Sequence, residues 1–362
     1  MNILFTPVQI GSVTVPNRFV RSATHDFMAD DEGNVTDANI ELYRRLAEGE
    51  VGLIITGHAH AQPSGKASPR QTAVFDDRFV EGLARIPEIA HRFPSRVFLQ
   101  IAHAGRQTKE KLCGCVPVSP SAIYDPVFKV MPRELAAEEI GALIAAFIAA
   151  GARAKKAGFD GVQLHAAHGY LLSSFLSPHT NRRQDEWGGS VKNRARILVE
   201  VLRGVKSACG RDFPVIVKLN STDFLEGGLV LDDAVRVALM LEAEGIDGIE
   251  VSGGMAEAGR GSVWAGLRSE EEEGYFAANA SAIKASVRVP AFALGGIRTL
   301  AVAERIVREG RADLVSLSRP FIRDPFLVKH FREGLAAKSE CISCNKCFNP
   351  RGIRCAELTK KR

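Results

Sequence analysis

Two histidines and a tyrosine follow an apolar run in the stretch DGVQLHAAHGYLLSSFLSP, residues 160–178. His165, His168 and Tyr170 could act as metal ligands, as core residues bonded to the backbone, or as groups that bind and protonate a substrate. A metal centre needs a third protein ligand, and the neighbouring strand ends supply no convincing one. A metal site is therefore disfavoured, while core residues and a substrate site both stay open until the elements that carry these side chains are known.

The composition is that of an ordinary globular protein. The chain has 362 residues, of which 46% are hydrophobic and 25% charged, and its net charge of +5 is spread along the sequence. This distribution argues against a nucleic-acid or membrane-surface partner. No apolar stretch approaches the roughly 18 residues that span a bilayer, and no signal peptide is evident, so we expect a cytoplasmic protein.

A short apolar run, a loop and a helix-like segment repeat along the chain. Runs of this length, rich in β-branched residues, are typical of strands. The predicted strands cover residues 18–24, 51–57, 96–102, 159–165, 214–220, 246–252, 290–296 and 312–318. Helix-like segments between them include residues 138–157, 192–208 and 232–244. Strands that are apolar throughout indicate a parallel sheet covered on both faces.

Eight such units predict an α/β protein with a single-domain (β/α)8 TIM barrel over residues 1–338. No Gly-x-Gly-x-x-Gly follows a strand, so a dinucleotide-binding Rossmann unit has no support. We expect residues 1–16 to form a short N-terminal lid over the bottom of the barrel. Residues 339–362 are expected to form a cysteine-rich C-terminal tail.

Polar residues and glycines gather at the predicted strand ends, where barrel enzymes place their chemistry. Glycine pairs follow the sixth and seventh strands, and Ser318-Arg319 follows the eighth. Such glycines let backbone N–H groups approach a phosphate, although they also simply make tight turns. Both interpretations of the glycine pairs stay open from the pattern alone.

Several long motifs resemble the old yellow enzymes and their NADH:flavin oxidoreductase relatives, with features of the 2,4-dienoyl-CoA reductase and trimethylamine dehydrogenase branch. The resemblance runs over nearly the whole chain, in the order LFTPVQIGSVTVPNRFVRSAT, LQIAHAGRQ, GFDGVQLHAAHGYLLSSFLSPHTNRRQDEWGGSVKNRARILVEV, FALGGI and LVSLSRPFIRDP. It implies FMN bound noncovalently at the barrel mouth, with NADH or NADPH as the reductant.

The resemblance also implies which residues contact FMN. Lys218 stands where the family usually has arginine, near the flavin N1 and O2 region, where a positive charge stabilises the anionic reduced flavin. His25 could tune the flavin potential or serve only in packing. The other implied FMN contacts are Ala23 and Thr24 along the ring system, Gly57 beside it, Gln100 at the pyrimidine edge, Gly254, and the phosphate-binding group of Gly295, Gly296, Ser318 and Arg319.

For the opening three residues, the resemblance implies catalytic roles. The two histidines would donate hydrogen bonds to a substrate carbonyl oxygen while hydride passes from FMN N5 to the β-carbon. Tyr170 would then protonate the α-carbon, because an unperturbed phenol with a pKa near 10 keeps its proton at neutral pH.

Four cysteines crowd the tail segment CISCNKCFNPRGIRC. Cys341, Cys344, Cys347 and Cys355 have a spacing typical of metal ligands in a reduced compartment. A [4Fe–4S] cluster, structural zinc, and free or oxidised thiols all stay open. The first three cysteines resemble the iron–sulfur ligands of the trimethylamine dehydrogenase branch, while the fourth comes sooner. A cluster here would require an external electron-transfer partner or would be vestigial.

The leading hypothesis is therefore an FMN-dependent NAD(P)H oxidoreductase that reduces activated C=C bonds of small enone-type substrates, with a homo-oligomer as a further expectation. The alternative among flavoenzymes is an amine dehydrogenase, a demethylase or a dienoyl reductase supplied by an external redox partner. Outside flavoenzymes, a phosphate-binding barrel enzyme could use Lys218 as a Schiff-base lysine.

Overall fold

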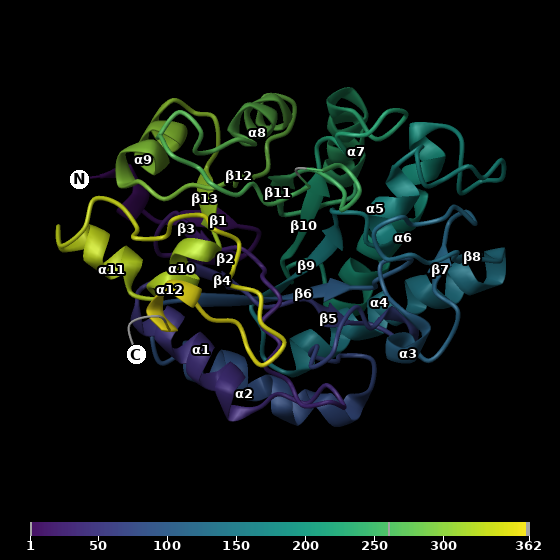
Figure 1. Ribbon diagram of the computed structural model, residues 1–362, viewed down its shortest axis with the longest axis horizontal. Coiled ribbons are helices and arrows are strands. Elements are labelled where there is room, and N and C mark those ends of the chain that lie inside the picture. The colour runs from purple at the N-terminus through teal and green to yellow at the C-terminus, as the bar shows by residue number, and fades with distance from the viewer. Residues whose placement is uncertain (1, 260, 360–362) are drawn as a thin grey trace.

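Eight parallel strands form a closed ring in the computed structural model, which describes residues 2–259 and 261–359 (Figure 1). Each strand pairs with two neighbours, and β4 joins β6 to β3 so that the ring closes. The ring strands are β3 (Phe19–Arg21), β4 (Leu53–Ile55), β6 (Arg96–Ala102), β9 (Gly161–Ala166), β10 (Val215–Asn220), β11 (Gly248–Ser252), β12 (Ala291–Ala293) and β13 (Leu314–Leu317). The predicted (β/α)8 TIM barrel is confirmed.

Helices cover the outside of this ring (Figure 1). The three predicted helices are present with ends shifted by one residue, because the apolar stripe sets their position more closely than their caps. The longer helices are α1 (Asp37–Glu48), α2 (Val80–Ala90), α4 (Ala137–Lys156), α6 (Val191–Cys209), α7 (Leu231–Ala243), α8 (Ala277–Lys284) and α9 (Leu300–Arg308). Shorter segments are η1 (Ile3–Phe5), β5 (Ala59–His60), η2 (Pro63–Gly65), η3 (Asp77–Phe79), α3 (Glu110–Cys113), β7 (Val118–Ser119), β8 (Arg133–Glu134), α5 (Leu171–Leu176), α10 (Arg319–Arg323), α11 (Leu327–Arg332) and α12 (Ala356–Thr359).

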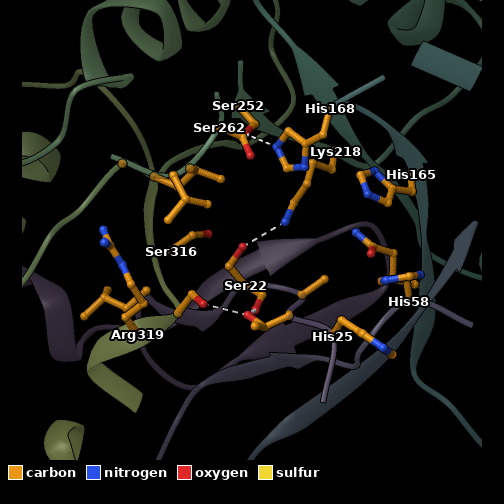
Figure 2. Close-up of a pocket in the computed structure, with 18 of the residues that line it drawn as sticks. Ser22, His25, His58, His165, His168, Lys218, Ser252, Ser262, Ser316 and Arg319 are labelled. Carbon is orange, nitrogen blue, oxygen red and sulfur yellow. Dashed lines mark hydrogen bonds between the residues drawn. The ribbon is translucent and has the colours of Figure 1, made fainter. Parts of the chain in front are cut away.

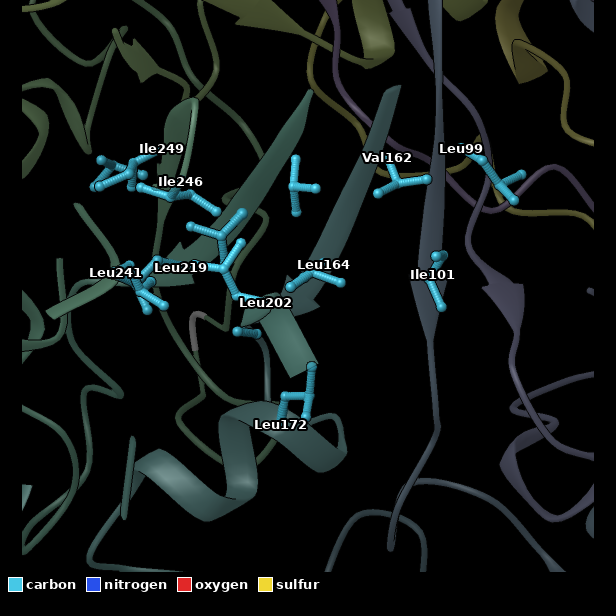
Figure 3. Packing of buried hydrophobic residues seen from close by; sticks show 14 of the residues in the cluster. Leu99, Ile101, Val162, Leu164, Leu172, Leu202, Leu219, Leu241, Ile246 and Ile249 are labelled. Carbon is cyan, nitrogen blue, oxygen red and sulfur yellow. The ribbon is translucent and has the colours of Figure 1, made fainter. Parts of the chain in front are cut away.

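Outward-facing strand residues make the main core. Leu164 and Leu219, for example, lie in one fully buried cluster with Leu202 of α6 and Leu241 of α7 (Figure 3). Successive strand residues point to opposite faces of the sheet, so this cluster uses only every second position. The positions between them point into the barrel.

The lower interior of the barrel is apolar and is closed by the N-terminal segment. Strands β1 (Val8–Ile10) and β2 (Val13–Val15) form an antiparallel hairpin. Ile10 and Val15 pack in a second core cluster with inward residues that include Phe98, Ile216 and Phe292. The hairpin lies within residues 1–16, the segment from which we expected a short lid over the bottom of the barrel.

The upper interior is polar. Gln100 Nε2 donates to Gln163 Oε1 at 2.7 Å, Gln163 Nε2 donates to Glu250 Oε2 at 2.8 Å, and Lys218 Nζ lies 3.3 Å from that same carboxylate oxygen. Burying polar groups costs free energy unless they are hydrogen-bonded, and this chain of contacts gives each of the four side chains, from four strands, at least one partner. The polar layer forms the floor beneath the barrel mouth.

The segment after residue 338 folds back over the mouth. Ser339 N–H donates to the Arg298 carbonyl at 2.8 Å, and Ile353 N–H donates to the Asp26 carbonyl at 2.7 Å. The tail thus contacts loops that follow both β3 and β12. Among the described residues, no helix is long and apolar enough to cross a membrane.

Candidate active site

A cavity of about 290 Å³ opens at the carboxyl ends of the ring strands. Parallel strands bring these ends to one face of the barrel, so residues distant in sequence meet there. Twelve of the predicted site residues line the cavity: Ala23, Thr24, His25, Gln100, His165, His168, Tyr170, Lys218, Gly295, Gly296, Ser318 and Arg319. Figure 2 shows His165 and His168 on one side, Arg319 on the other, and Lys218 with Ser22 between them.

The two histidines and the tyrosine form one group. The ring centroids of His165 and His168 are 5.4 Å apart at an interplanar angle of 85°, and those of His165 and Tyr170 are 4.7 Å apart. His165 is the inward residue near the end of β9, whereas the other two follow in the loop before α5. Their three polar groups can therefore contact a single small molecule in the cavity.

Burial fixes the protonation of this group. Desolvation lowers the pKa of His168 to about 3 and the pKa of His165 well below its ordinary value, and the Lys218 charge lowers both further. Burial raises the pKa of Tyr170 to about 12. At neutral pH both imidazoles are uncharged, each with one N–H donor, and the phenol holds its proton.

The backbone conformation of His168 is held by several neighbours. Its φ of 65° lies in the left-handed region, which is uncommon for a residue other than glycine. Its N–H donates to Asn220 Oδ1 at 3.0 Å, its carbonyl accepts from Gln107 Nε2 at 2.8 Å, and its Nε2 lies 2.7 Å from Ser252 Oγ. A strained residue kept in place by three contacts is typical of a functional position.

Lys218 supplies the positive charge of the cavity floor. Its Nζ donates to Ser22 Oγ at 2.9 Å and is buried, with 3% of the residue exposed (Figure 2). Gln100, predicted to contact a flavin edge, lies on the same floor and bonds Gln163. The family motifs did not indicate that Gln163 and Glu250 belong to this floor. Their positions as polar residues inside apolar predicted strands were a signal that could have identified them.

Glycines and a short helix start form the opposite end of the cavity. Gly295 and Gly296 have φ values of 121° and 73°, which also explains why β12 is shorter than the predicted strand. In the described residues, the amides of these glycines and of Ser318 and Arg319 make no turn or cap hydrogen bond to a backbone carbonyl. Thr24 Oγ1 lies 2.7 Å from Ser318 Oγ and joins this end to β3. Backbone amides that are open in this way, next to the positively charged Arg319, are suited to bind a phosphate.

Two predicted cofactor contacts do not line the cavity in the described structure. Gly57 N–H donates to Tyr43 Oη at 3.0 Å, behind the strand end. Gly254 N–H donates to the Thr222 carbonyl at 2.7 Å, and a side chain at residue 254 would meet the Gly261 carbonyl. Tertiary packing thus directs Gly57 toward helix α1 and Gly254 toward the loop after β10.

His58, one residue past the predicted Gly57, lines the cavity instead. Gln71 Oε1 accepts from Ala67 N–H at 2.7 Å, so Gln71 Nε2 is the atom that donates to His58 Nδ1 at 2.7 Å. Burial lowers the pKa of His58 to about 3, and its single proton therefore lies on Nε2. His58 in the segment TGHAH, at the end of a predicted strand, was the sequence signal that could have indicated this cavity residue.

His25 occupies the rim of the same region. Its Nε2 lies 2.6 Å from Ser68 Oγ, and its ring centroid is 3.8 Å from that of Phe27 and 4.8 Å from that of His58. These contacts satisfy the ring in packing, and its predicted effect on a flavin stays a prediction.

The tail approaches the cavity through Asn345 and Phe348. Asn345 Oδ1 accepts a hydrogen bond from Arg319 at 2.5 Å, and Phe348 lines the cavity. The four tail cysteines are free, and within residues 2–259 and 261–359 no group of three or more His, Cys, Asp or Glu side chains is placed to hold a metal ion. The iron–sulfur cluster and the zinc site stay predictions.

Comparison with known proteins shows the family to which this barrel belongs. Residues 3–338 match the model of the NADH:flavin oxidoreductase / NADH oxidase family, and the chain belongs to this family. It is 38% identical to an NADH oxidase of Thermoanaerobacter brockii over 94% of this chain and 52% of that protein. It is 35% identical to an NADPH dehydrogenase of Bacillus subtilis over 90% of this chain and 93% of that one.

The chain also superposes on solved structures over most of its length. A 2-naphthoyl-CoA reductase in complex with 2-naphthoyl-CoA superposes with a TM-score of 0.89 at 33% identity, over 95% of this chain and 54% of that chain. An old yellow enzyme homologue from Zymomonas mobilis superposes with a TM-score of 0.81 at 27% identity, over 98% and 97% of the two chains. The chain thus spans about half the length of some relatives and nearly the whole length of others.

The cavity fits the FMN that the family implies. Ser316 Oγ and His165 Nδ1 are buried polar atoms without a partner in the described structure, and both residues line the cavity. Lys218 would face the flavin ring system, and the open amides beside Gly296 and Arg319 would face its phosphate. Family membership favours this interpretation over a flavin-free enzyme with Lys218 as a Schiff base.

Gly296→Ala is expected to raise the dissociation constant for FMN by about tenfold or more. Each factor of ten corresponds to a loss of about 1.4 kcal/mol of binding free energy. The φ of 73° disfavours a side chain, and the new Cβ would collide with Leu267 and lie 3.0 Å from a ring atom of Tyr275. Titration of flavin fluorescence measures the affinity.

Gly310→Ala is the matched control, because its φ is 70° and no heavy atom lies within 4 Å of the added Cβ. Both variants should lose about 1–2 kcal/mol of unfolding free energy from backbone strain. Equal FMN affinities in the two variants would contradict the assignment of Gly296 to the phosphate end.

Proposed function

We propose that the chain is an FMN-dependent NAD(P)H oxidoreductase that reduces C=C bonds conjugated to a carbonyl group. One observation carries the proposal: two uncharged histidines and a protonated tyrosine converge on one side of a cavity whose floor holds Lys218. An amine substrate has no carbonyl oxygen to accept two such donors, so the arrangement favours unsaturated carbonyl compounds over amines.

FMN, when bound, supplies the hydride that reduces the substrate. His165 and His168 bind the substrate carbonyl oxygen through their N–H donors and stabilise the negative charge that develops on this oxygen. Ser252 can donate its hydroxyl proton to His168 Nε2, 2.7 Å away, and this contact would keep the imidazole proton on Nδ1 as a donor. Donors that are already oriented need little reorganisation during the reaction.

Tyr170 supplies the proton that completes the reduction. A phenol whose pKa is raised to about 12 stays protonated at every physiological pH and is available to the α-carbon when negative charge reaches it. Solvent can restore the proton after each turnover because the cavity is open at the barrel mouth.

The relatives support a substrate of this class. The 2-naphthoyl-CoA reductase, whose structure superposes on 95% of this chain, is in complex with a thioester whose carbonyl is conjugated to an aromatic ring. The NADPH dehydrogenase of Bacillus subtilis, matched over most of its length, supports a nicotinamide nucleotide as reductant. Together with the His165, His168 and Tyr170 group, they favour a conjugated carbonyl compound as the oxidant.

An anaerobic absorption spectrum of the purified protein tests the proposal. We expect flavin bands that bleach on addition of NADH or NADPH and return on addition of 2-cyclohexen-1-one. Cyclohexanone, which lacks the C=C bond, should leave the reduced spectrum unchanged. A protein that stays colourless after incubation with FMN, or that reacts equally with both ketones, would rule the proposal out.

A further inference from the structure

Glu250 lies directly beside the lysine of the cavity floor. It is the register partner of Lys218 on the neighbouring strand, its Oε2 is 3.3 Å from Lys218 Nζ, and it is fully buried. Gln163 Nε2 donates to the same oxygen at 2.8 Å, while Oε1 has no partner in the described structure. A carboxylate in this position is costly to bury. Glu250 does not line the cavity itself and is connected to it by Lys218 directly and by Gln163 through Gln100.

Burial at this depth disfavours the charged form of a lysine. Burial lowers the pKa of Lys218, and the Glu250 carboxylate opposes that shift. An arginine would stay charged in the same place without help, whereas a lysine loses its proton readily when buried. The Glu250 carboxylate therefore favours the charged form of Lys218, which burial disfavours.

The other groups near Lys218 do not replace Glu250. Arg21 on β3 adds a second positive charge and so opposes protonation of the lysine. Burial keeps the three nearby histidines uncharged, since it lowers the pKa of each. These histidines are His165 on β9, His168 in the loop after it, and His58 after β4. Glu250 is the carboxylate within ion-pair distance of Lys218 among the described residues.

We propose that Glu250 is a positioning residue that keeps Lys218 protonated beneath the flavin, so that the lysine–glutamate pair provides the lasting positive charge that one arginine could provide. This inference rests on the proposed function, because it assigns the Lys218 charge to the negative charge of reduced FMN. In the wild-type protein, reduction then takes up two electrons and one proton. Without the carboxylate, Lys218 is neutral beforehand and binds a second proton from solvent as the flavin is reduced.

The midpoint potential of the bound flavin, measured against pH with dithionite as reductant, tests this inference in the full-length chain. Because two protons then accompany two electrons, the slope for Glu250→Gln should be about twice the wild-type slope. Glu250→Gln combined with Lys218→Arg should restore the one-proton slope, since arginine needs no carboxylate to stay charged. Glu273→Gln is the matched control, because Glu273 is buried and pairs with Arg298, which does not line the cavity.

A two-proton slope in the wild type, an unchanged slope in Glu250→Gln, or an equal change in Glu273→Gln would overturn the inference. A flavin-free measurement separates it from the proposed function. The unfolded chain binds more protons than a fold in which Lys218 is neutral, so stability then rises with pH. In urea titrations without FMN, the stability deficit of Glu250→Gln should shrink between about pH 7 and pH 9.5. A constant deficit shows that Glu250 does not keep Lys218 protonated and overturns the inference. Failure to bind FMN overturns the proposed function, while these urea titrations still decide whether Glu250 keeps Lys218 protonated.

Discussion

Tyr170→Phe is expected to slow reduction of an enone by about 10²- to 10⁴-fold, the usual contribution of a general acid, while flavin reduction by NADH or NADPH changes by less than about twofold. The variant removes only the phenolic oxygen, so the ring contact with His165 at 4.7 Å can remain. Stopped-flow absorbance measures the two half-reactions separately. Because the pKa of Tyr170 is about 12, the wild-type enone rate should not fall through loss of this proton between about pH 6 and pH 9.

Tyr124→Phe provides the control for loss of a phenol, since the Tyr124 side chain is exposed on a loop. Neither half-reaction should change in that variant. If Tyr170→Phe slowed both half-reactions equally, the residue would act in flavin binding or in folding, and the role as proton donor would be wrong.

His165→Ala combined with His168→Ala should weaken binding of a phenolic ligand by about 100-fold or more. Each hydrogen bond to a phenolate oxygen is worth about 1.5–3 kcal/mol, because the acceptor is charged. A phenolate resembles the oxygen of a polarised enone, so its affinity reports on the two donors without any turnover. Titration of the long-wavelength absorption of the flavin–phenol complex measures the dissociation constant.

The double variant must first be shown to bind FMN, since His168 is held by Asn220 and Ser252 at the cavity wall. His91→Ala is the control, because His91 lies on the protein surface and pairs with Asp160. Unchanged phenol affinity in a double variant that still binds FMN would show that the histidines do not bind the substrate oxygen.

The order of strands and helices was predictable from the sequence because each element carries its own apolar pattern. Runs such as residues 214–220 are apolar on the outward positions, and the strand and helix limits differ from the predicted ones by only a few residues. Closure of eight such units into a barrel then brings the strand ends to one face, and most of the predicted site residues line one cavity there.

Interactions between distant segments were not predictable in this way. Whether Gly57 or His58 faces the cavity depends on Tyr43 and Gln71, which bond these neighbouring residues from other elements. The return of the tail, which places Phe348 at the cavity and Asn345 on Arg319, likewise follows from packing across the barrel mouth.

The sequence by itself therefore determined the barrel, the family resemblance and the chemical types at the strand ends. The tertiary structure decided the protonation of those groups, because an uncharged His168 and the pairing of Lys218 with Glu250 both depend on burial. Burial and through-space charge are properties of the assembled barrel, and no local pattern of residues contains them.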